Sequence, residues 1–154
     1  MGLDMYIYRK SKGEQVAYWR KANAVLSWLN RHIEKEEDDI ENCKEYYIDK
    51  ELLEELKRDC VKVLSKPELV NKEIEVEQYD YEHHGRIKVK RIIEVLKDSS
   101  LAEELLPTEE GYFYGSTIYD ERYLDDLRNT IEQIDKILET TDFNTQNLYF
   151  HAWW

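Results

Sequence analysis

The residue types best suited to hold a ligand gather in two stretches of this sequence. AYWRKAN, residues 17–23, joins aromatic rings to two cations and an amide, and GYFYGSTIY, residues 111–119, places tyrosines around a Gly-Ser-Thr turn. Rings stack on flat ligands, cations neutralise phosphate, and amides or hydroxyls fix orientation. The two stretches therefore predict a pocket for a small anionic, nucleotide-like ligand, unless their aromatic side chains only fill the core. The expected ligand-binding residues are Trp19, Arg20, Lys21, Asn23, Tyr112, Tyr114, Ser116, Thr117 and Tyr119.

A metal centre is not expected. His83 and His84 are adjacent, so in a strand they would point to opposite faces. Cys43 and Cys60 lack the close spacing with which two thiolates bind one ion. Cys60 instead lies on the apolar stripe of a predicted helix, where a free cysteine is a small core residue. No cofactor is predicted either.

No catalytic set is visible in the sequence. Ser116 lies in a turn and His151 near the C-terminus, but neither belongs to a GxSxG nucleophile motif. The turn that contains Ser116 lacks the lysine of a phosphate-binding P-loop, and Asp120 and Glu121 would place negative charge at the start of the following helix. The sequence therefore favours binding without turnover. A nucleotide hydrolase that uses carboxylates is a weaker alternative.

The charge of the chain argues against a long polyanion as partner. There are 22 Lys and Arg against 34 Asp and Glu, a net charge of −12, which would repel nucleic acid. Residues 1–33 are locally basic, whereas residues 34–59 and 101–142 are strongly acidic. The basic end suits a small anion. The acidic segments suggest an alternative function, a protein-interaction module that blocks a host protein. A homo-oligomer is compatible with either function.

Nothing in the sequence indicates export or a membrane anchor. Two cysteines are too few for a disulfide framework, and neither a signal-peptide pattern nor a span of about 20 apolar residues is present. We therefore expect a soluble protein in the reducing cytoplasm.

The spacing of apolar residues predicts a single α+β domain over residues 1–154. Alternation predicts terminal strands at 3–9 and 147–153, able to pair with each other, and a β-hairpin excursion at 73–91. Helical spacing predicts one helix at 17–33, a second capped by Asp49 and a last one at 121–140 capped by Asp120. Ser100 and Glu103 fit a capping box before a short helix. Three or four helices would then cover a small antiparallel sheet built from the terminal strands and the hairpin.

Several blocks of the sequence resemble a family of small proteins. The blocks are GLDMYIY at 2–8, VAYWRKAN at 16–23, ELLPT at 104–108, GYFYGSTIYDERY at 111–123 and the aromatic C-terminus. They are similar to blocks in uncharacterised proteins of phages and of bacterial genomes that carry prophages. The resemblance implies a phage accessory protein in a bacterial host cell. Such proteins often oppose host defence, some by sequestering nucleotide immune signals, but the resemblance implies no catalytic residue.

Overall fold

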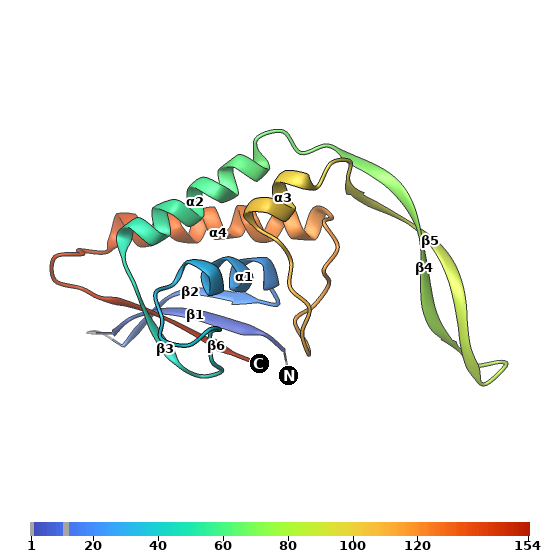
Figure 1. Ribbon diagram of the computed structural model, residues 1–154, viewed down its shortest axis with the longest axis horizontal. Helices are drawn as coiled ribbons and strands as arrows, with labels where there is room; N and C mark the ends of the chain where they lie inside the picture. The colour runs from blue at the N-terminus through green and yellow to red at the C-terminus, as the bar shows by residue number, and fades with distance from the viewer. Residues whose placement is uncertain (1, 11–12) are drawn as a thin grey trace.

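The computed structural model describes residues 2–10 and 13–154 and has the predicted α+β architecture (Figure 1). Its main sheet is antiparallel and has the strand order β2-β1-β6-β3. These strands are β1 (Asp4–Arg9), β2 (Glu14–Arg20), β3 (Glu45–Ile48) and β6 (Leu148–Trp153). The helices are α1 (Asn23–His32), α2 (Lys50–Leu64), α3 (Ser100–Leu105) and α4 (Glu121–Thr140). They lie on one side of the sheet and leave its other face open (Figure 1).

The terminal strands pair as predicted, with Ile7 opposite Phe150 at the centre of the ladder. Alternation along each strand directs small and apolar side chains, such as Met5 and Ala152, toward the helices. The helices complete the core through direct contacts. Trp28 of α1 stacks on His32 with ring centroids 3.8 Å apart and donates its indole N–H to Asp59 of α2 at 2.8 Å. Strand β3 joins the sheet beside β6 and was not predicted from the sequence.

The prediction of one helix over 17–33 is wrong in its first third. Residues 17–20 belong to β2, where Ala17 and Trp19 point inward and Tyr18 points outward. The chain switches from strand to helix at Lys21, whose φ is +56°, a left-handed conformation that disfavours a continuous helix. A hydrogen bond from the Lys21 N–H to the Leu3 carbonyl at 2.7 Å holds this switch. Pairing with β1 outweighs the local helical spacing.

The two long helices begin where their caps were predicted. Asp49 accepts a hydrogen bond from the Leu52 N–H at 2.8 Å, and Asp120 accepts one from the Tyr123 N–H at 3.1 Å. Cys60 is fully buried between α2 and its neighbours, and burial raises the pKa of its thiol to about 12. Among the described residues, no helix combines the length and the apolar character needed to cross a membrane.

The short helix α3 begins one residue earlier than its capping-box pattern indicated. Its N-cap is Ser99, not Ser100, and the Ser99 hydroxyl donates to the Glu103 carboxylate at 3.2 Å. The N–H of Ser100 is taken instead by the Asp98 side chain at 3.0 Å. A capping box with Ser100 as N-cap would need the Ser100 N–H to donate to the Glu103 side chain, but this N–H already donates to Asp98.

The hairpin is longer than predicted and does not join the main sheet. Strands β4 (Leu69–Asp80) and β5 (Gly85–Leu96) form a separate two-stranded ribbon with an unbroken register from Leu69 opposite Leu96 to the tip. Figure 1 shows this ribbon projecting away from the helices and the sheet. We call residues 69–96 the arm.

Helix α4 carries a carboxyl group that should make stability depend on pH. Burial raises the pKa of Asp126 to about 6 from 3.8; Arg122 opposes this shift and Asp125 and Asp120 add to it. A raised carboxyl pKa favours the folded state most below pH 3.8, and this advantage is lost as pH rises from 3.8 to about 6. Asp126→Asn should therefore be more stable than the wild type at pH 7, by about 2 kcal/mol, with the two equal near pH 4. Urea unfolding at both pH values tests this, and an equal difference at both would contradict it.

Candidate functional site

The open face of the main sheet is covered with rings. Strand alternation that sends Met5, Ile7 and Phe150 into the core sends aromatic side chains outward on all four strands. We call this surface the tyrosine face. Its rings are Tyr6 and Tyr8 on β1, Tyr18 on β2, Tyr47 on β3, and Tyr149, His151 and Trp153 on β6. All are partly or largely exposed to solvent.

Four rings of the tyrosine face lie close enough to form one continuous platform. Tyr6 is at its centre, with centroid separations of 5.9 Å to Tyr8, 5.2 Å to Tyr18 and 6.0 Å to His151. Tyr6 stands directly opposite Tyr18 on one side and His151 on the other, so the cross-strand register places these three rings in a row. A neighbouring pair, edge to face at 5.9 Å, is formed by Tyr47 and Tyr149.

Charged groups border this platform. At one end the Arg20 guanidinium donates to Asp4 at 3.1 Å, and the Tyr18 hydroxyl donates to the same carboxylate at 2.6 Å. At the other end Lys10 pairs with Glu45 at 2.9 Å and lies 4.7 Å from the centre of the Tyr149 ring. Each cation is thus fixed beside a ring, and the Arg20 side chain remains half-exposed.

Residues 109–119, which include the Gly-Ser-Thr turn predicted from the sequence, lie next to the Arg20 end of the platform; we call this segment the turn. Lys21 lies between the two regions. On the platform side it is close to Gly2, where an added Cβ would lie 3.4 Å from Lys21 Cε and 3.2 Å from Arg20 Nη2. On the turn side it is close to Gly115, where an added Cβ would lie 3.1 Å from Lys21 Cβ. The Leu3 N–H also donates to the Phe113 carbonyl at 3.2 Å. The two stretches singled out in the sequence therefore meet in space.

Asn23 is the residue that holds the turn against the body. It is buried, and its amide donates to the carbonyls of Tyr114 at 3.1 Å and Ser116 at 3.0 Å. Its side-chain oxygen accepts the Glu109 N–H at 3.1 Å. Gly111 completes the fit, since a Cβ there would come within 2.5 Å of the Tyr114 ring.

An open hollow of about 610 Å³ follows the outer side of this turn. Its lining includes Tyr112, Ser116 and Thr117 from the predicted set, together with the acidic residue Glu110. The Arg122 guanidinium approaches it and donates to the Ser116 carbonyl at 3.3 Å. Within the described part of the chain, Lys21 forms no ion pair. Two cations, Lys21 and Arg122, thus lie beside the hollow and could neutralise an anion bound next to Ser116, while Glu110 contributes one negative charge to the lining.

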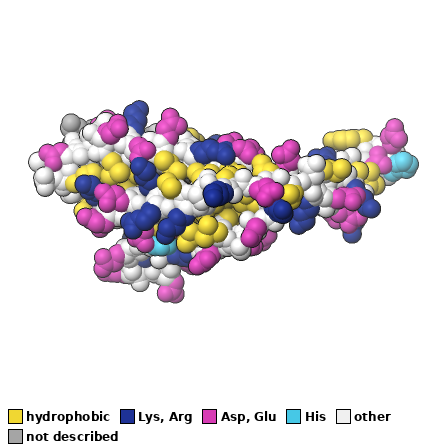
Figure 2. Space-filling model, turned by 90° about the horizontal axis from the view of Figure 1, so that it is seen from above, with side chains coloured by type: hydrophobic (Ala, Val, Ile, Leu, Met, Phe, Trp, Pro, Cys, Tyr) yellow, Lys and Arg dark blue, Asp and Glu magenta, His cyan; other side chains and the backbone are white. Residues whose placement is uncertain are grey.

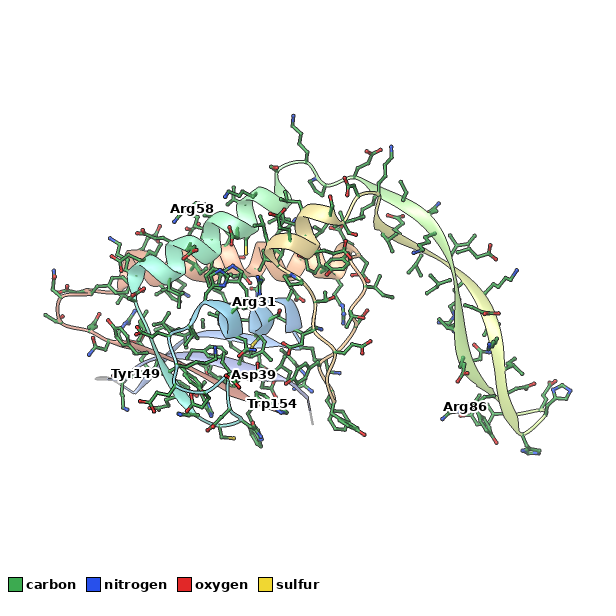
Figure 3. All side chains as sticks on the ribbon, in the orientation of Figure 1. Arg31, Asp39, Arg58, Arg86, Tyr149 and Trp154 are labelled. Atoms are coloured by element: carbon green, nitrogen blue, oxygen red, sulfur yellow. The ribbon has the colours of Figure 1, made fainter. Side chains whose placement is uncertain are left out.

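A second hollow, of about 210 Å³, adjoins the same turn and is more acidic. Glu109 and Asp39 line it together with the rings of Tyr114 and Trp154; Figure 3 shows Asp39 and Trp154 near each other at the edge of the body. Burial, and then the charge of Asp39, raises the pKa of Glu109. Negative charge makes this hollow unsuitable for an anion.

The predicted site residues are thus divided between different roles. Trp19 was expected to stack on a ligand, and this is wrong because its ring is only 2% exposed and donates to the Thr130 hydroxyl at 2.9 Å. Asn23 and Tyr114 are also buried and position the turn. Tyr119 is half-buried, and its hydroxyl accepts the Thr108 N–H at 3.1 Å. The other predicted residues remain accessible to a ligand. Arg20 is exposed, Tyr112, Ser116 and Thr117 line the 610 Å³ hollow, and Lys21 lies beside them.

No known protein family, curated protein or solved structure matches this chain. The tyrosine face was missed from the sequence, although the alternating tyrosines of residues 3–9 contained the signal. Arg122 was missed as well, and its position two residues after the helix cap is consistent with a side chain that leans back toward the turn.

One cluster of possible metal ligands occurs in the described residues, and it lies apart from these surfaces. Asp80, Glu82 and His83 gather at the tip of the arm with their ligand atoms within 4.8 Å of one another. His83 Nδ1 lies 2.6 Å from Asp80 and is engaged with it. Exposed acidic groups of this kind are common in proteins without a metal.

Proposed function

We propose that this protein binds a small nucleotide-like ligand without turnover, with the base on the tyrosine face and the phosphate groups near Arg20 and Lys21. The observation that carries the proposal is the set of seven rings on the open face of the sheet, four of which form a continuous platform around Tyr6. Flat aromatic platforms on antiparallel sheets are one of the ways in which proteins hold unpaired bases, because every base has a face that can stack.

The charges support a small ligand over a polymer. Arg20 and Lys21 adjoin the row formed by Tyr18, Tyr6 and His151, so a base on these rings could place its phosphate at the two cations. The hollow beside Tyr112 and Arg122 could accept a second phosphate or sugar. The overall charge of −12 would oppose a long strand of nucleic acid.

The cellular role that we propose follows from the resemblance to phage and prophage proteins. A binder of this size in the cytoplasm of a bacterial host would act by depleting a nucleotide signal, such as a cyclic nucleotide or an ADP-ribose derivative, that host defence requires. Binding alone is sufficient for this anti-defence role. Recovery of intact ligand after long incubation would agree with it, whereas accumulation of cleavage products would instead favour the hydrolase alternative.

The proposal predicts that two substitutions on the tyrosine face weaken ligand binding. A thermal-shift panel of cyclic dinucleotides, ADP-ribose and ATP should include a compound that stabilises the wild-type protein. Titration calorimetry with that compound should show at least about a tenfold loss of affinity for Tyr6→Val, which removes the central ring, and for Arg20→Gln.

Matched controls for both changes lie on the arm. Tyr79 is an exposed strand tyrosine and Arg86 an exposed arginine beside an acidic partner, so Tyr79→Val and Arg86→Gln make the same chemical changes away from the platform. Figure 3 shows Arg86 near the far end of the arm. The proposal fails if no compound in the panel stabilises the protein at ligand excess, or if the arm variants lose as much affinity as Tyr6→Val.

The alternative proposal is that the acidic segments 34–59 and 101–142 form a module that binds a host protein. It predicts that capture of a partner from host lysate survives Arg20→Gln and is lost when acidic residues of α4 are neutralised. Neutralising Glu132 and Glu139 would test it, because neither has an ion-pair partner among the described residues. Capture that is unaffected by these changes would exclude this alternative.

A further inference from the structure

The second hollow beside the turn combines an apolar lining with negative charge. Its volume is about 210 Å³, below the roughly 300 Å³ at which pockets for drug-sized ligands begin, so it suits a small ligand. Its apolar and aromatic lining comes from Leu26, Ile40, Tyr114 and Trp154, and its two carboxyl groups come from Asp39 and Glu109. We call it the acidic hollow.

Neither carboxyl group of the acidic hollow has a cationic partner in the described part of the chain, where every ion pair joins other residues. Over the face that Figure 2 shows, in contrast, acidic side chains lie among Lys and Arg side chains. Asp39 accepts a hydrogen bond from the Asn30 amide at 2.8 Å. Glu109 Oε2 is shielded from solvent and has no hydrogen-bond partner among the described residues. The negative charge of this hollow is therefore not neutralised by any residue that the structure describes.

The two carboxyl groups make it unfavourable for both to be ionised. Burial, and then the charge of Asp39, raises the pKa of Glu109. A cation within about 4–6 Å of a carboxylate has the opposite effect, because it favours the ionised form. A cation in the acidic hollow would therefore offset both the repulsion and the desolvation of Glu109.

The rest of the lining indicates which kind of cation fits. The Tyr114 and Trp154 rings meet edge to face with centroids 5.8 Å apart, and aromatic rings attract organic cations. Leu26 and Ile40 are buried apolar residues, which suit an alkyl chain. A metal ion would instead bind through several oxygen ligands. Among the described residues such a cluster occurs at the tip of the arm and not in this hollow.

We propose that the acidic hollow binds a small primary alkylammonium ion, with the ammonium group between Asp39 and Glu109 and the alkyl chain against Leu26 and Ile40. The N–H groups of a primary ammonium can donate to both carboxylates. This site is separate from the proposed nucleotide site, because its lining includes no ring of the tyrosine face. The two proposals can therefore fail independently.

The indole N–H resonances of the protein measure binding directly. Trp154 lines the acidic hollow, whereas Trp28 is buried elsewhere and donates to Asp59 of α2. In a titration with n-butylammonium chloride at neutral pH and constant ionic strength, the Trp154 resonance, assigned with Trp154→Phe, should shift saturably and that of Trp28 should not. We expect a dissociation constant on the order of 1 mM. Three probes should bind at least about tenfold more weakly: n-butanol has the chain without the charge, tetramethylammonium has the charge without N–H donors, and Mg²⁺ lacks the chain.

Substitution of Glu109 tests the role of its charge. Glu109→Gln keeps the shape of the side chain and the backbone N–H bond to Asn23, so the dissociation constant should rise at least about tenfold without loss of the fold. Glu110→Gln is the matched control, because it removes the same charge from the next residue, which lines the other hollow. It should change the dissociation constant less than about twofold.

Three results would overturn the proposal. The first is a Trp154 resonance without a saturable shift up to about 100 mM n-butylammonium. The second is binding of n-butanol, tetramethylammonium or Mg²⁺ as tight as that of n-butylammonium. The third is a Glu109→Gln variant that binds n-butylammonium as tightly as Glu110→Gln does.

Discussion

Replacing Trp19 by alanine is expected to lower the free energy of unfolding by about 3–5 kcal/mol. The indole is among the largest fully buried side chains and lies between β2 and α4, where its N–H donates to the Thr130 hydroxyl at 2.9 Å. Alanine would leave a cavity between the sheet and the helix and remove the donor. Urea unfolding followed by circular dichroism measures the loss, and the ligand affinity of the fraction that remains folded should be unchanged.

Trp19→Phe separates the two contributions of the indole. Phenylalanine keeps most of the packing and removes only the hydrogen bond, so a loss of about 1 kcal/mol is expected. The Thr130 hydroxyl keeps its own bond to the Asp126 carbonyl at 2.7 Å, which limits the cost. A Trp19→Ala variant as stable as the wild type but unable to bind ligand would show that Trp19 stacks on the ligand after all.

Asn23→Ala is expected to release the turn at residues 109–119. The substitution removes three hydrogen bonds at a buried position. The Asn23 side chain accepts one from the Glu109 N–H and donates two, to the carbonyls of Tyr114 and Ser116. We expect a loss of about 2–3 kcal/mol in unfolding free energy. Hydrogen exchange of the Glu109 amide, which donates to Asn23, should become faster than exchange in the main sheet.

Asn129→Ala is the matched control for this change. Asn129 is exposed on α4, so its truncation should alter stability by less than about 0.5 kcal/mol. If Asn23→Ala is as neutral as Asn129→Ala, and Glu109 remains protected, then the turn is held by contacts other than Asn23.

Local signals in the sequence are sufficient for the elements that depend on near neighbours. Asp49 and Asp120 cap their helices because a cap needs only the next three residues. The hairpin follows from alternation on both sides of its turn, and the terminal strands follow from the alternation within each. The strand over residues 17–20 is different, because AYW is compatible with a helix until its pairing with β1 is known.

The site could be predicted only in part for the same reason. The sequence predicted a site at Arg20, Lys21 and residues 111–119, and the structure brings these segments together. It could not separate Trp19 from Tyr18, although one is in the core and the other on the tyrosine face. That difference depends on which side of β2 the helices cover. Register between distant strands also places Tyr6 between Tyr18 and His151, and no local pattern encodes this register.

The most direct test of the proposed tyrosine face is an NMR titration of the protein with labelled tyrosine rings. The ligand is the nucleotide that gives the largest thermal stabilisation. Ring-current shifts are expected for Tyr6, Tyr18 and Tyr149, with Tyr79 and Tyr81 on the arm unchanged. Ligand saturation that leaves Tyr6 and Tyr18 unshifted, or that shifts the arm tyrosines equally, would contradict the account.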